Sequence, residues 1–287
     1  MPQDSDCVVL LGTKGGPAIR PGSSMPTSSL LRIGGMDIVV DCGLGVTRAL
    51  VDQGVRLTDL RLIFITHLHS DHYLELGPLM HTAWTAGLKS RVDIWGPAGL
   101  EAYWSGFIAS MTADIDLRIE DEGRPDLRAL IVLHEIRAGE AMTVGPVQVQ
   151  AIRTLHPPLV DCFALRFESN GKAVVFSADT APFPEMADFA QGAELLIHEA
   201  MLTEALAALV ARVGNGDDRL MRHLLRSHTP AEAAADLAAR SGVKALALNH
   251  LIPSDDPAYG EADWQRAVSG HWSGPFHLGT DGLVIPF

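Results

Sequence analysis

The chain has 287 residues, of which 47% are hydrophobic and 20% are charged, and this composition is ordinary for a globular enzyme with a sizeable core. Its 22 basic and 35 acidic side chains give a formal net charge of −13, which repels a phosphate backbone and argues against a large nucleic-acid footprint. A small-molecule substrate therefore fits the composition better than a polynucleotide.

The cysteines and the hydropathy pattern favour a cytoplasmic protein. Cys7, Cys42 and Cys162 are odd in number and widely spaced, so we expect buried free thiols rather than a disulfide framework. The first residues lack the basic segment of a secretory signal, and no apolar run approaches the ~18 residues that cross a membrane. We therefore expect no membrane partner.

The first part of the chain predicts a β-hairpin followed by β-α units. A strand is expected at residues 7–11, and the four glycines and three prolines between Gly12 and Pro26 make that stretch a loop. Gly34 and Gly35 join two further strand candidates as a hairpin would. The other elements expected here are strands at 29–33, 37–40, 60–66 and 93–96 and helices at 45–53, 74–86 and 100–110.

The second part predicts more strands and two alanine-rich helices after an acidic, turn-rich stretch at 114–124. Thr229 is the expected N-cap of the last helix, with Pro230 at its first position. The expected elements are strands at 130–135, 147–155, 163–168, 173–177, 194–197 and 244–248 and helices at 202–212 and 230–240. Both halves run from hairpin strands to helices, which indicates two related β-rich layers with helices outside.

A dense group of metal-ligating side chains lies between His67 and His72, in the order His-Leu-His-Ser-Asp-His. It directly follows the apolar run at 60–66, so the group should lie at the end of a buried strand. Histidine and aspartate suit zinc, manganese or iron, and several such groups left unpaired together would cost more than a fold normally tolerates. Metal binding is therefore favoured over a solvated polar loop that is rich in histidine.

Three more candidate ligands follow later strand candidates, as a site for two metals would require. His156 follows the strand at 147–155, Asp179 follows the strand at 173–177, and His250 follows the strand at 244–248. Each has an ordinary alternative, because a lone histidine after a strand is commonly a hydrogen-bonded loop residue, and an aspartate before a threonine commonly forms a turn or cap.

Taken jointly, the order His-x-His-x-Asp-His followed by His156, Asp179 and His250 resembles the metallo-β-lactamase superfamily of hydrolases over nearly the whole chain. The resemblance implies an α/β fold of four αββα layers, in which two mixed β-sheets pack face to face with helices outside, and a single domain over residues 1–287. It also implies two divalent metal ions, with zinc expected and manganese or iron as alternatives. The implied ligands are His67, His69 and His156 for one metal and Asp71, His72 and His250 for the other, with Asp179 bridging both.

Other segments are similar to the ribonuclease Z branch of that superfamily and to its arylsulfatase-like bacterial relatives. These segments are Leu11-Gly12-Thr13, Asp41-Cys42-Gly43, Ser177-Ala178-Asp179-Thr180, Ser227-His228-Thr229 and, for the second group, Leu278-Gly279-Thr280-Asp281-Gly282. In that branch a glutamate in a His-Glu-Ala segment orients a late histidine, and Glu199 and His228 match. Such a carboxylate keeps the imidazole protonated as a donor to a leaving oxygen. The implied catalytic residues are thus Glu199, His228 and Asp71, with a surface ion pair as the alternative for the first two.

The reaction that this resemblance implies is hydrolysis, in which a metal-bridging hydroxide attacks a small ester. A proton donor such as His228 favours substrates with poor leaving groups, so we expect a phosphodiester or an aryl sulfate. Family members that process transfer RNA carry a tRNA-binding arm between the third histidine and the bridging aspartate, but only 23 residues separate His156 from Asp179, which leaves no room for that arm.

The alternatives to this function are a lactone or cyclic-amide hydrolase with the same metals and a binding protein without catalysis. Relatives in this branch are often dimers, which implies a homodimer.

Some residues near the motifs could line the substrate pocket. Tyr73, Trp84 and Trp104 could receive an apolar group, although such residues more commonly belong to the core. Lys14 and Arg20 could contact an anion if their loop borders the site. Five histidines match no motif and are expected in solvent or at hydrogen-bonded positions, namely His81, His134, His223, His271 and His277.

Overall fold

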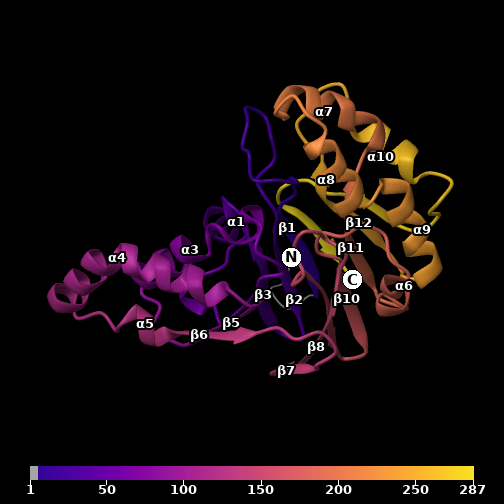
Figure 1. The fold of residues 1–287 in the computed structure, drawn as a ribbon. Helices are drawn as coiled ribbons and strands as arrows, with labels where there is room; N and C mark the ends of the chain where they lie inside the picture. Colours follow the sequence, from indigo (N-terminus) through magenta and orange to yellow (C-terminus); the bar gives the residue numbers. More distant parts are fainter. Residues whose placement is uncertain (1–5) are drawn as a thin grey trace.

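The computed structural model describes residues 6–287, and within this range the strands form two mixed, seven-stranded sheets (Figure 1). The first sheet, in spatial order, consists of β14 (Leu283–Pro286), β1 (Cys7–Gly12), β2 (Ser28–Ile33), β3 (Met36–Cys42), β4 (Leu62–Phe64), β5 (Val92–Gly96) and β6 (Ile131–Glu135). The second consists of β13 (Phe276–Leu278), β12 (Leu246–Ile252), β11 (Leu195–Met201), β10 (Lys172–Phe176), β9 (Phe163–Ser169), β8 (Val147–Arg153) and β7 (Met142–Val144).

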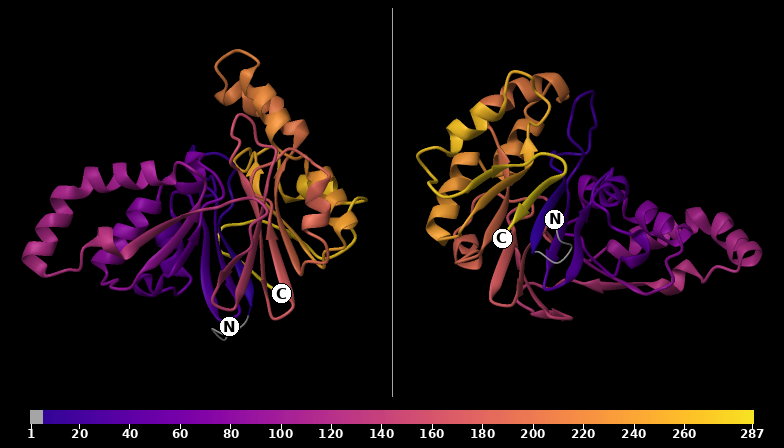
Figure 2. Two further views of the ribbon diagram at one scale, coloured as in Figure 1. Left: turned by 60° about the horizontal axis from the view of Figure 1, so that its bottom comes forward. Right: turned by 180° about the vertical axis from the view of Figure 1, so that it is seen from behind.

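The helices lie on the outer sides of the two sheets (Figures 1 and 2). On the side of the first sheet are α1 (Val46–Asp52), α2 (Ser70–Tyr73), α3 (Leu76–Thr85), α4 (Leu100–Glu122) and α5 (Leu127–Leu130). On the side of the second are α6 (Glu185–Phe189), α7 (Leu206–Val213), α8 (Arg219–Ser227), α9 (Ala231–Ser241) and α10 (Glu261–Val268). Short 3₁₀ turns occur at η1 (Leu57–Asp59) and η2 (Thr203–Ala205). This arrangement confirms the predicted αββα sandwich.

The central strands are apolar on both faces because each sheet is covered on one face by the other sheet and on the other face by helices. In β11, Leu195 and Ile197 belong to the core between the two sheets, whereas Leu196 and Ala200 belong to the core under the outer helices of the second sheet. None of the helices in residues 6–287 combines the length and the apolar character needed to cross a bilayer.

Strand direction brings the predicted site residues to one edge of the sandwich. β3 and β4 run parallel to each other, as do β10, β11 and β12. β8 and β10 each pair antiparallel with β9, so β8 also runs in the direction of β10. The carboxyl ends of parallel strands meet at the same edge, which is where ligands bind in such sheets.

Two segments project from this edge and lie side by side. The glycine- and proline-rich loop between β1 and β2 extends beside α7 and α8 in both views that show it clearly (Figures 1 and 2). Residues of the loop and of both helices line one cavity. The cavity at this edge of the sandwich is thus bordered by the loop and by the two helices.

The prediction of a turn-rich stretch at 114–124 is wrong, because α4 continues through it to Glu122. Ile115 is fully buried in the core beneath the helix, and Arg118 forms ion pairs with Asp114 and Glu122 one turn away on either side. Burial of one face and i,i+4 pairs can maintain a helix in an acidic sequence. The helix ends at Gly123, whose φ of 66° is the left-handed conformation of a C-terminal glycine.

The start of α9 also differs from the prediction. Pro230 is the N-cap and the helix begins at Ala231, so Thr229 does not cap it. Instead, the Thr229 hydroxyl donates a hydrogen bond to the Thr180 carbonyl at 2.6 Å. The expected helix at 74–86 corresponds to α3, which begins at Leu76 with Glu75 as its N-cap. The Glu75 carboxylate accepts hydrogen bonds from the backbone N–H groups of Gly45 and Thr47. The short helix α2, which precedes this range, was not predicted.

Candidate metal centre

The seven predicted metal ligands lie together at the carboxyl edge of the two sheets. The first four follow β4 and reach into α2, His156 follows β8, and Asp179 follows β10. His250 was predicted to follow its strand, but β12 continues through it to Ile252 with a local irregularity in register. Its backbone has a φ of 45°, an uncommon conformation that turns the side chain toward the site.

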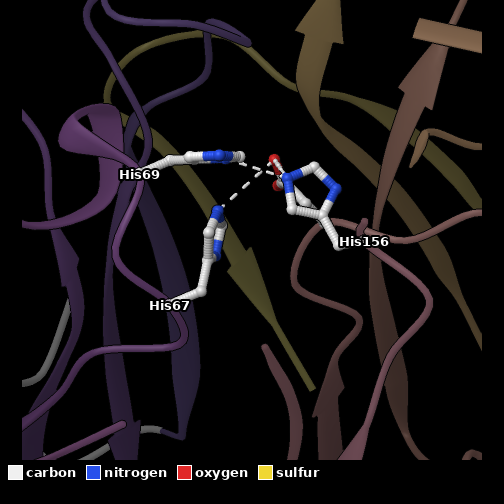
Figure 3. Close-up of side chains that lie close together, drawn as sticks. His67, His69 and His156 are labelled. Carbon is white, nitrogen blue, oxygen red and sulfur yellow. Dashed lines mark hydrogen bonds and ion pairs between the residues drawn. The ribbon is translucent and has the colours of Figure 1, made fainter. Parts of the chain in front are cut away.

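The first group of ligand atoms comes from both sheets. His67 and His69 from the first sheet point toward His156 from the second (Figure 3). One oxygen of Asp179 lies 3.6 Å from Nε2 of His67 and 3.6 Å from Nε2 of His156, and His69 Nδ1 lies 2.9 Å from His156 Nε2. Donor atoms held ~2.0–2.1 Å from one tetrahedral zinc ion lie roughly 3.3–3.4 Å apart, so this group has the spacing of a metal site.

The second group shares the same aspartate. His250 Nε2 lies 3.3 Å from an oxygen of Asp71 and 3.2 Å from one of Asp179, and His72 Nε2 lies 3.6 Å and 3.4 Å from the same two carboxylates. Asp179 thus contacts candidate ligands of both groups, as the predicted bridging carboxylate would.

Hydrogen bonding sets the tautomers so that lone pairs point into the site. The Thr66 hydroxyl donates to Asp41 and therefore accepts from Nδ1 of His67 at 3.1 Å. His72 donates through Nδ1 to Asp41 at 2.8 Å, and His156 donates through Nδ1 to the Ser227 carbonyl at 2.9 Å. The Nε2 atoms of His67 and His72 and Oδ1 of Asp179 are buried without a hydrogen-bond partner among residues 6–287. A cation supplies what these atoms lack, so the side chains fit the implied divalent metal.

The electrostatic balance of the cluster also favours a cation. Burial lowers the pKa of His67 well below its usual value, and it lowers the pKa of His156 to about 4, so both rings are neutral as ligands must be. Burial acts to lower the pKa of His72 as well, but the carboxylates of Asp179, Asp41 and Asp71 raise it well above its usual value. The same concentration of negative charge attracts a divalent ion.

Asp41 accepts hydrogen bonds from Nδ1 of His72 and from the Thr66 hydroxyl, so replacing it should weaken metal binding. Asp41→Asn removes the acceptor that His72 and Thr66 share, so we expect a 10–100-fold loss of zinc affinity in competition with a chromophoric chelator. The left-handed backbone of Asp41, with a φ of 63°, tolerates asparagine without strain. Asp37→Asn, on the exposed part of the same strand, is the matched control and should bind zinc as the wild type does. Unchanged affinity in Asp41→Asn would contradict this role.

Glu199 and His228 form a buried pair next to the cluster, which does not fit the alternative of a surface ion pair. Both side chains are at most 5% exposed, and His228 Nδ1 donates to Glu199 Oε1 at 3.1 Å. The same oxygen accepts from the backbone N–H of Thr180, directly after Asp179. Burial acts to lower the pKa of His228, but Glu199 outweighs it and the pKa rises to about 9. The imidazole is therefore protonated at neutral pH.

A cavity of about 480 Å³ opens onto the cluster and contains one functional candidate that the sequence analysis missed. His69, Asp71, Asp179, His228 and His250 form its polar floor. His223, which matched no motif, also lines it, because α8 places this residue one turn before Ser227 and its ring faces those of His69 and His228. No local signal marked His223, because the segment that forms α8 was not predicted to be helical.

The proposed pocket residues fall into two groups. Lys14 and Arg20 line the cavity as their loop borders it, but both form ion pairs with Asp255. Trp84 and Trp104 are buried in the core beneath the outer helices of the first sheet, and Tyr73 packs against that core. These aromatic residues therefore stabilise the fold rather than receive a substrate.

The other unassigned residues mostly behave as predicted. His81 contacts Asp114, His134 contacts Asp93, and His271 contacts Asp236, each through a side-chain hydrogen bond. His277 is partly buried. The three cysteines are buried and unpaired.

Comparison with known proteins gives three kinds of match. Residues 8–214 match the family described as "Anti-Pycsar protein Apyc1". A ribonuclease Z of Mycobacterium sp. (strain KMS) is 32% identical over 278 residues, covering 96% of this chain and 93% of the relative. The crystal structure of the metallo-beta-lactamase fold protein YhfI from Bacillus subtilis superimposes with a TM-score of 0.73 at 22% identity, covering 98% of this chain and 99% of YhfI. Human tRNase Z, short form, superimposes with a TM-score of 0.66 at 20% identity, covering 97% and 98%.

Proposed function

Because the chain belongs to the ribonuclease Z-like branch of the metallo-β-lactamase superfamily of metal-dependent hydrolases, and to the family of the anti-Pycsar protein Apyc1, we propose that it hydrolyses small phosphodiesters with two divalent metal ions. The observation that carries the proposal is the pair of ligand groups that meet at Asp179 on the floor of a cavity. The donor set of five histidines and two aspartates favours zinc, with manganese or iron as alternatives.

The ligand set proposed here is the one that the sequence predicts. His67, His69 and His156 would hold one ion, Asp71, His72 and His250 the other, and Asp179 would contact both. Metal ions held by these residues would lower the pKa of a bound water and would neutralise negative charge on the ester oxygens. Asp71 is further held by the backbone N–H of Gly16, which donates to its Oδ2 at 2.8 Å.

The Glu199–His228 pair would supply the proton that the leaving group needs. Glu199 holds Nδ1 of His228, so the other ring nitrogen is free to donate toward the cavity. Alkoxide leaving groups require such a donor, which favours phosphodiesters of ordinary alcohols. The ribonucleases among the relatives act on an ester of this class, so we place phosphodiesters ahead of aryl sulfates.

A small substrate is supported by the shape of the chain around the site. Between His156 and Asp179 the chain forms only β9 and β10, joined at Asn170-Gly171, so the protruding arm expected of transfer-RNA-processing members is not at this place. Residues of α7, of α8 and of the loop between β1 and β2 line the cavity. The cytoplasmic location, the homodimer and the single domain over residues 1–287 also stay proposals.

A substrate panel tests the proposed function. Zinc- or manganese-restored protein is assayed with bis-p-nitrophenyl phosphate, p-nitrophenyl sulfate, a γ-lactone and a short oligoribonucleotide, each with and without chelator. We expect chelator-sensitive turnover that is fastest with the phosphodiester. Faster lactone opening would favour the alternative hydrolase, and the absence of metal-dependent turnover of any ester would refute the proposal.

A further inference from the structure

His223 lies in the cavity wall but outside both candidate ligand groups. Its ring centre lies 6.2 Å from that of His69, 5.9 Å from that of His156 and 5.7 Å from that of His228. The ring therefore borders the space in front of the proposed metal site, where a bound ester would lie, without joining the ligands.

Hydrogen bonding indicates which nitrogen of His223 faces this space. The Ser227 hydroxyl has one hydrogen, which it donates to the Pro157 carbonyl at 2.8 Å. Its oxygen can therefore only accept from Nδ1 of His223, 3.4 Å away. In the neutral imidazole, Nε2 is then a hydrogen-bond acceptor, and no residue in 6–287 donates to it.

Apolar side chains of the same helical hairpin line the cavity together with His223. Leu220 and Leu224 lie on α8 within one turn of His223, and Leu209 and Val213 face the cavity from α7. The wall thus offers one acceptor within an apolar surface, next to a floor of candidate metal ligands. A wall of this kind is complementary to a carbon skeleton that carries a hydroxyl group.

We propose that His223 is a substrate-binding residue whose Nε2 accepts a hydrogen bond from a hydroxyl group on the alcohol part of the phosphoester, while the carbon atoms of that part pack against Leu220 and Leu224. The inference rests on the proposed function for the phosphoester itself. It adds the class of alcohol, one that keeps a free hydroxyl close to the ester bond.

Binding of stable phosphonates tests the inference without turnover. Calorimetry on zinc-loaded protein compares 2-hydroxyethylphosphonate with ethylphosphonate and 3-hydroxypropylphosphonate with propylphosphonate. For at least one pair we expect the hydroxylated compound to bind about 3–10-fold more tightly, the effect of one hydrogen bond. The preference should disappear in His223→Asn, whose amide can still donate to Ser227 but lacks a group at the position of Nε2. His223→Gln, which has an oxygen that can reach that position, should keep part of it.

Controls separate this inference from the proposed function. Leu225→Ala alters an exposed residue of the same helix outside the cavity wall and should keep the full preference. Leu225→Ala should also hydrolyse bis-p-nitrophenyl phosphate as fast as the wild type does, because this residue does not line the cavity. A wild type without any preference, or a preference that survives in His223→Asn, would overturn the role of His223. Absence of metal-dependent turnover in the wild type would refute the proposed function. The phosphonate comparison would still show whether His223 binds the hydroxyl group.

Discussion

Asp179→Asn is expected to lower metal-dependent phosphodiester turnover by about three orders of magnitude or more, because this carboxylate would hold both of the proposed ions. In the structure, the two Asp179 oxygens contact Nε2 of His67, His72, His156 and His250 at 3.2–3.6 Å, so both ligand groups lose the negative charge that they share in this variant. The metal content should fall below two equivalents per chain. The measurements are turnover of bis-p-nitrophenyl phosphate and elemental analysis after gel filtration.

The control for this variant is Asp121→Asn, an exposed acidic residue on α4 away from the site. It should retain both the metal and the activity. Thermal unfolding of the metal-free proteins shows whether Asp179→Asn is folded. If folded Asp179→Asn kept its metal and at least a tenth of its activity, the carboxylate could not be the bridge.

His228→Ala should have an effect that depends on the leaving group. For a phosphodiester with an alkoxide leaving group, such as benzyl methyl phosphate, we expect kcat to fall by about 10²–10⁴-fold, the usual contribution of a positioned acid. For bis-p-nitrophenyl phosphate the loss should be at least tenfold smaller, because p-nitrophenolate leaves without a proton. The measurement is kcat for both substrates at saturating metal.

Two further variants check that this effect belongs to the acid. Glu199→Gln should lower the alkyl-ester rate less than His228→Ala does, since the histidine remains but loses the carboxylate that keeps it protonated. His271→Ala, which removes a half-exposed histidine paired with Asp236, should leave both rates unchanged. An equal loss on both esters in His228→Ala would mean that this residue positions the substrate and does not donate a proton.

The sequence patterns predicted two β-rich layers with helices outside and candidate ligands at strand ends, whereas the αββα fold class and the full ligand set were predicted from the resemblance to the superfamily. Apolar runs followed by His67, His156 and Asp179 marked strand ends, and parallel strands bring their carboxyl ends to one edge. Glu199 and His228 are 29 residues apart in the chain, and they were paired through the resemblance rather than through any local signal.

The full length of α4, the place of His223 and the burial of the tryptophans could not be predicted from local sequence, because tertiary contacts determine them. The second half of α4 is acidic and weakly amphipathic, and burial of Ile115 keeps it helical. His223 has no motif, and only the formation of α8 places it beside His69. Trp84 and Trp104 are close to the histidine motif in sequence, yet they point into the core on the other side of the first sheet.

The central claim is that these separate segments enclose two cations, and anomalous diffraction from metal-loaded crystals tests it most directly. Data collected on both sides of the zinc absorption edge should show two peaks per chain about 3.5–4 Å apart, one beside His67, His69 and His156 and the other beside Asp71, His72 and His250. A map with no peak at these side chains, or with zinc bound only elsewhere on the chain, would contradict the account.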